Sequence, residues 1–140
     1  MARCFNFGNV SEEDRKKWTD RLQNVLDSPT AQRRFSDFLE KRDLEAGREL
    51  LKFLGNCQEF LSEANGYDEV KLLEEAQKIV NLADDKINLT AEMYTLNDAV
   101  KSRDINKIKV AITAAQKEAA TLLQDEGYKE FCAHLLPKNH

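Results

Sequence analysis

Hydrophobic side chains recur at helical spacing along most of this chain. Residues 1–10 show no helical period, but after them the apolar positions of successive segments fall on one side of a helix. No stretch alternates apolar and polar positions for long enough to predict a strand. The pattern therefore predicts an all-helical bundle with seven or eight helices joined by short loops.

Small polar residues mark the starts of these predicted helices, because their side chains can accept a hydrogen bond from the first turn. Ser28 is followed by Pro29, which suits the first helical position. Asn65 and Gly66 are expected to end one helix and Gly127 another. The predicted cap residues are Ser11, Ser28, Asp43, Asp68, Thr90 and Asp104.

One segment is apolar on two sides and is therefore expected at the centre of the bundle. It runs from Leu50 to Leu61 and carries four large apolar side chains and Cys57 between these ends. The predicted core consists of Trp18, Leu22, Phe35, Phe38, Leu39, Leu51, Phe53, Leu54, Phe60, Ile79, Leu123 and Phe131.

Composition excludes several classes of protein. Of 140 residues, 41% are hydrophobic and 33% charged, which excludes a disordered tail and a membrane protein. Only 5 Gly and 2 Pro argue against a sandwich or barrel of many short strands. The net charge of −4 argues against binding nucleic acid through its phosphates.

The residues suited to chemistry at neutral pH are few. The two histidines, His134 and His140, lie near the C-terminus, and no metal-binding, phosphate-binding or nucleophile motif is present. The three cysteines fit neither a zinc site nor a disulfide framework. We therefore expect no active site, metal or cofactor. The start lacks an apolar signal region, which favours the reducing cytoplasm.

Six short motifs follow one another between Trp18 and Leu135. Their order, from an opening Trp through an apolar central helix and an Ile-Asn-Leu hinge to Leu-Leu-Gln-Asp-Glu-Gly-Tyr, resembles that of the regulator of G-protein signalling (RGS) domain. The chain is similar to a divergent member of that family. The motifs are Trp18–Pro29, Phe35–Leu39, Leu51–Phe60, Ile87–Leu89, Ala115–Glu118 and Leu122–Phe131.

The resemblance implies an RGS-type fold of about nine helices in two subdomains, one of them a four-helix bundle. It divides the chain into an N-terminal arm (1–10), an RGS-like domain (11–136) and a C-terminal tail (137–140). It also implies a protein that binds the Gα subunit of a heterotrimeric G protein and speeds GTP hydrolysis there. We expect this protein to be a monomer. Such a protein would be cytoplasmic and would reach the plasma membrane through a partner.

The resemblance assigns candidate Gα contacts residue by residue. Asn88 matches the Asn that reaches toward the Gα active-site glutamine. Read alone, Asn88 would be a helix-boundary residue that bonds its own backbone. Glu126 stands where the family has Asp, and Glu130 stands where it has Arg. The candidate contacts are Asn88, Leu122, Glu126, Glu130, Glu45 and Gly47.

Two departures from the family pattern leave two functions open. The segment from Leu44 to Leu50 lacks the usual acidic pair followed by Asn, and Glu130 reverses a charge. The first function is a Gα-binding regulator that is a weak or selective GTPase activator. The second is an RGS-homology scaffold or adaptor that has lost GTPase activation and binds another signalling protein or a peptide. An enzyme is a distant third.

Overall fold

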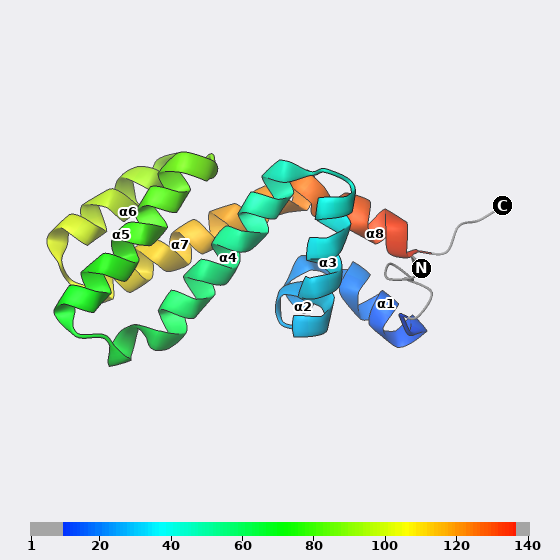
Figure 1. Cartoon of the computed structure of the whole chain (residues 1–140), viewed down its shortest axis with the longest axis horizontal. Coiled ribbons are helices and arrows are strands. Elements are labelled where there is room, and N and C mark those ends of the chain that lie inside the picture. Colours follow the sequence, from blue (N-terminus) through cyan, green and yellow to red (C-terminus); the bar gives the residue numbers. More distant parts are fainter. Residues whose placement is uncertain (1–9, 137–140) are drawn as a thin grey trace. The chain divides into compact units, whose positions relative to one another are not determined.

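The computed structural model describes residues 10–136, and every regular element in that range is helical (Figure 1). A 3-10 turn, η3 (Ala64–Gly66), follows α4, and an irregular segment, η4 (Gln124–Tyr128), separates α7 from α8. The α-helices are α1 (Glu12–Asp20), α2 (Leu22–Leu26), α3 (Pro29–Lys41), α4 (Glu45–Glu63), α5 (Glu69–Lys86), α6 (Ala91–Ser102), α7 (Ile105–Leu123) and α8 (Lys129–Leu135).

The all-helical prediction is confirmed for residues 10–136, but the count of nine helices is wrong there. The structure has eight α-helices in this range, and the apolar pattern predicts seven or eight. The residues between α7 and α8 add no further α-helix, because Glu126 and Gly127 leave helical geometry and form a kink. No helix within the described range is long and apolar enough to cross a membrane.

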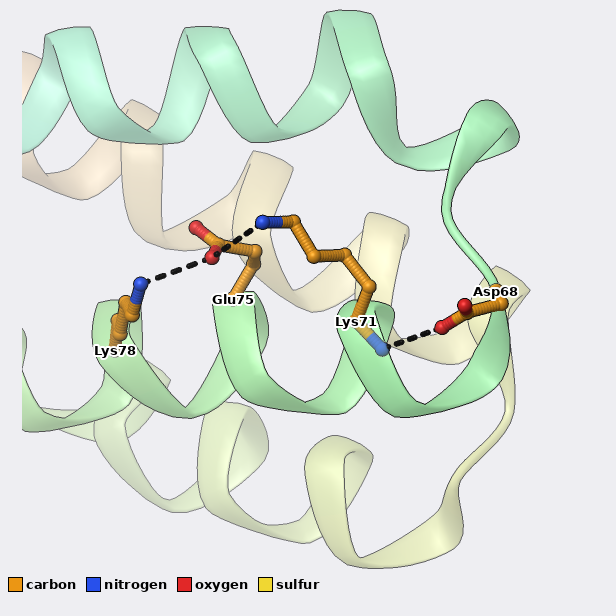
Figure 2. A network of polar contacts seen from close by, with 4 residues as sticks. All are labelled: Asp68, Lys71, Glu75 and Lys78. Carbon is orange, nitrogen blue, oxygen red and sulfur yellow. Dashed lines mark hydrogen bonds and ion pairs between the residues drawn. The ribbon is translucent and has the colours of Figure 1, made fainter.

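Local capping explains where several helices begin. The Ser11 hydroxyl accepts a hydrogen bond from the Asp14 amide at 3.0 Å, and the Ser28 hydroxyl accepts one from Ala31 at 3.2 Å. Figure 2 shows the start of α5, where the Asp68 carboxylate accepts a hydrogen bond from the Lys71 amide at 2.8 Å. These three predicted caps are confirmed.

Ion pairs continue along the exposed side of α5 (Figure 2). Glu75 pairs with Lys78 at 3.0 Å and with Lys71 at 3.6 Å, at helical spacings of three and four residues. The hydrogen bond from Lys78 lowers the pKa of the Glu75 carboxyl. Exposed pairs of this kind stabilise a helix by only a few tenths of a kcal/mol each, about 0.2–0.5.

Two predicted caps behave differently. Asp43 has a left-handed backbone (φ 58°), and the first turn of α4 begins one residue later, with the Arg48 amide donating to the carbonyl of Leu44. Thr90 precedes α6, but its side chain makes no capping bond within that helix. Sequence spacing locates both helix starts, but it does not predict which groups form the hydrogen bonds there.

The described chain divides into two compact units. Unit 1 comprises residues 1–48 and 124–140, of which 10–48 and 124–136 are described. Its core is aromatic: the Phe131 ring lies 4.8 Å from that of Phe35 and 5.4 Å from that of Phe38. The buried Tyr128 hydroxyl donates a 2.7 Å hydrogen bond to the carbonyl of Trp18, which ties α1 to the start of α8.

Unit 2 (Glu49–Leu123) contains α5, α6, α7 and most of α4, and these four helices lie side by side as a bundle (Figure 1). Its interior is filled by apolar side chains from all four helices, among them Phe53, Ile79, Leu96 and Ile112. Of the core predicted for both units, all side chains are buried except Leu51, which is half-buried.

Candidate functional site

The hinge between α5 and α6 presents Asn88 to solvent. Ile87 and Leu89 on either side are buried, with 7% and 8% of their surface exposed, whereas Asn88 is exposed. Ile87 is extended (φ −116°, ψ 137°), and in extended backbone neighbouring side chains point in opposite directions. The hinge therefore anchors itself through two apolar side chains and turns the amide between them outward.

The far end of the hinge is held by α7. The Thr90 amide donates a 3.1 Å hydrogen bond to Oε2 of Glu118, and the Thr90 hydroxyl donates one of 2.9 Å to the same oxygen. Leu122, which is half-buried, follows one turn later on the same side of α7. We call Ile87–Thr90 together with Glu118 and Leu122 the hinge surface; all of it belongs to unit 2.

The second group of candidate residues surrounds the kink in unit 1. Gly127 adopts φ 155°, and a side chain at this position would overlap Leu39. The carbonyl of Glu126 lies against Gly47, which is buried near the start of α4. We call Glu45–Gly47 and Glu126–Glu130 the kink surface. Within this surface Glu45 is exposed and Gly47 is buried. The missing side chain of Gly47 lets the start of α4 approach the kink closely.

The charges on the kink surface are mostly acidic. Glu126 and Glu130 are exposed, and the kink separates Glu126 from the regular helix that starts at Lys129. Lys129 pairs with Asp125 at 2.8 Å, and this hydrogen bond raises the pKa of the lysine. The cation nearest in sequence to Glu126 and Glu130 therefore pairs with Asp125.

The structure offers little for catalysis within residues 10–136. No group of three His, Cys, Asp or Glu side chains there could hold a metal ion. Cys57 is buried, and burial raises the pKa of its thiol to about 12, which makes it unreactive. A pocket of about 140 Å³ in unit 2 is lined by Asn56, Glu59, Phe60, Tyr67, Glu75, Lys78 and Ile79, with no nucleophile and base paired in it.

The chain matches the family model of the Regulator of G protein signaling (RGS) domain over residues 21–136. The chain belongs to the RGS domain family. RGS domains act as GTPase activators without a catalytic site of their own. No curated protein and no solved structure matched this RGS domain.

The predicted Gα contacts fall in both units of the chain. The backbone carbonyl of Glu126 lies against Gly47 in unit 1, and Asn88 and Leu122 lie in unit 2. Sequence reasoning missed the role of Glu118, which it quoted only as part of a motif. Its partner Thr90 lies 28 residues away, so no local spacing indicates the contact.

Proposed function

We propose that this RGS domain binds a Gα subunit in its hydrolysis transition state and acts as a weak or selective GTPase activator. The exposed Asn88 amide, held between two buried neighbours, is the observation that carries the proposal. In this mechanism the domain makes and breaks no bond. Asn88 orients the Gα glutamine that positions the attacking water, and Gα supplies the catalytic groups.

The remaining candidate contacts have simpler roles. Leu122 offers apolar surface next to the hinge, while Glu126 and Glu45 offer acceptors for backbone or side-chain donors of Gα. Glu130 places a carboxylate where the family has Arg, so a contact typical of the family is lost. We propose that this loss reduces activation of common Gα subunits.

The cellular setting follows from the same proposal. The domain would act as a monomer in the cytoplasm and meet the plasma membrane through its Gα partner. It needs no cofactor, because Gα carries the nucleotide and metal on which hydrolysis depends.

A scaffold or adaptor function is the second candidate, and the kink surface favours it. Lys129 is paired with Asp125, and Glu126 and Glu130 are exposed, which leaves an acidic surface where activating members carry a cation. In this alternative the fold is kept and the acidic surface binds a basic segment of another signalling protein.

A pulldown separates the two functions. The chain is incubated with a Gαi-type subunit loaded with GDP alone, or with GDP, Mg²⁺ and aluminium tetrafluoride, which imitates the transferring phosphoryl group. We expect binding chiefly in the second condition and its loss in Asn88→Ala. Asn106→Ala, at an exposed position near the start of α7, is the matched control and should bind like the parent. Equal or absent binding in both conditions would contradict the proposal and favour the adaptor.

A further inference from the structure

The start of α6 lacks the cap that its sequence predicts. Thr90 precedes the helix with φ −103° and ψ −102°, and its hydroxyl accepts no hydrogen bond from the first turn. Instead, both the amide and the hydroxyl of Thr90 donate to Glu118 on α7. The hinge thus ends in a contact with a distant helix rather than in a local cap.

The Glu118 carboxylate is committed to this contact. Both bonds from Thr90 reach Oε2, while Oε1 is buried and has no hydrogen-bond partner among the described residues. Hydrogen bonds to an ionised carboxylate are stronger than those between neutral groups. Thr90 is therefore the group that orients this side chain, and Glu118 in turn fixes the Thr90 backbone.

Asn88 lies between two anchored points. On one side the Ile87 amide donates to the carbonyl of Ala83 at 3.0 Å and closes α5. On the other side Thr90 is bound to Glu118, and Leu89 between them is buried. Because only a few residues separate the anchors, releasing either one frees the backbone that carries the Asn88 amide.

We infer that Glu118 is a positioning residue: its bonds to Thr90 hold the hinge so that Asn88 is ordered before Gα arrives. Glu118 itself touches no reacting group. The inference rests on the proposed function for its consequence in Gα binding. The contact with Thr90 can be tested without Gα. Ordering a segment in advance reduces the entropy lost on binding, so removing Glu118 should weaken binding.

The first experiment uses the free chain. Amide hydrogen exchange, followed by NMR, is compared in the parent, Glu118→Ala and Lys117→Ala. Lys117 is the adjacent, exposed position on α7 and serves as the control. We expect Glu118→Ala to lose the protection of the Thr90 amide while amides in the core of unit 2 keep theirs. Unchanged protection at Thr90 would overturn the inference whether or not Gα binds.

The second experiment is a double-mutant cycle in affinity for Gαi loaded with GDP and aluminium tetrafluoride. Glu118→Ala should weaken binding roughly three- to tenfold in the parent and have little further effect in Asn88→Ala. Thr90→Ser keeps the hydroxyl and should bind like the parent, whereas Thr90→Val should weaken binding. A merely structural role of Glu118 would give equal losses in both backgrounds.

The outcomes distinguish the inference from the proposed function. If the parent binds and Glu118→Ala binds equally well, or if its loss is the same with and without Asn88, the positioning role is wrong and the proposed function stands. If the parent itself does not bind, the proposed function is wrong and the role of Glu118 toward Gα falls with it.

Discussion

The backbone carbonyl oxygen of Glu126 lies directly against Gly47, so that a Cβ atom at position 47 would overlap it. Leu39 closes the same space from another side, since its Cδ2 would lie 2.9 Å from that Cβ. A side-chain tip can move, but a carbonyl held in the kink between α7 and α8 cannot move without shifting the chain. The start of α4 and the kink are thus packed through a residue without a side chain.

Gly47→Ala should destabilise unit 1 by about 1–3 kcal/mol, the usual cost of forcing extra atoms into a packed site. Gly55→Ala is the matched control, because nothing lies within 4 Å of a Cβ there and the position is inside α4. Alanine favours a helix interior over glycine by up to about 1 kcal/mol, so the control should be stabilised. Urea unfolding measures both variants, and a Gly47→Ala as stable as the parent would contradict the packing described here.

Tyr128→Phe should lower the free energy of unfolding by about 1–2 kcal/mol. The substitution removes the hydroxyl that donates to Trp18 at 2.7 Å and leaves that carbonyl, buried in unit 1, without its donor. Tyr94→Phe is the control, because Tyr94 is 78% exposed. Equal stability of the two variants in thermal or urea unfolding would show that the bond contributes nothing.

The free energy of unfolding should fall at alkaline pH because of the buried thiol of Cys57. Burial raises its pKa from an ordinary 9.0 to about 12, so the thiol stays protonated in the folded state after it ionises in the unfolded state. The stability that depends on the protonated thiol is fully present below pH 9.0, and it is lost as the pH rises toward about 12. Between about one unit below and one unit above 9.0, the parent should lose about 1.4 kcal/mol more than Cys57→Ala. Parallel pH profiles would contradict this assignment.

Glu130→Arg should strengthen GTPase activation of a Gαi-type subunit. It places a cation on the kink surface where the family has Arg, and it does not remove either partner of the Lys129–Asp125 pair. An exposed charge contact is worth up to about 1 kcal/mol, which corresponds to roughly fivefold in rate. Glu74→Arg on α5 makes the same change in net charge at another exposed site and should have no effect. A slower Glu130→Arg would mean that Glu130 is itself a working contact.

The features that sequence predicts well are those fixed by neighbouring residues. Ser11, Ser28 and Asp68 cap their helices through the amide three residues later, so spacing alone reveals them. The apolar periods likewise predict the all-helical fold, and all but one of the side chains predicted for the core are buried. Leu51 is predicted to be in the core but is half-buried. The helical period indicates which side of a helix faces the core, but it does not indicate how completely neighbouring segments cover each side chain.

The features that sequence does not predict depend on contacts between distant segments. Glu118 and Thr90 are 28 residues apart, and Gly47 meets Glu126 across most of the chain. A glycine inside a predicted helix does not indicate which other segment of the chain packs against it. The role of Asn88 came from the family resemblance, and the structure adds its exposure between two buried neighbours.

Single-turnover GTP hydrolysis by a Gαi-type subunit, with the parent and Asn88→Ala, tests the central claim most directly. We predict that the parent accelerates hydrolysis and that Asn88→Ala reduces this acceleration about tenfold or more, equal to about 1.4 kcal/mol. Its free energy of unfolding should change by no more than about 0.5 kcal/mol, as is usual for an exposed position. If Asn88→Ala accelerates hydrolysis as well as the parent does, or if the parent has no effect on the rate, the account is contradicted.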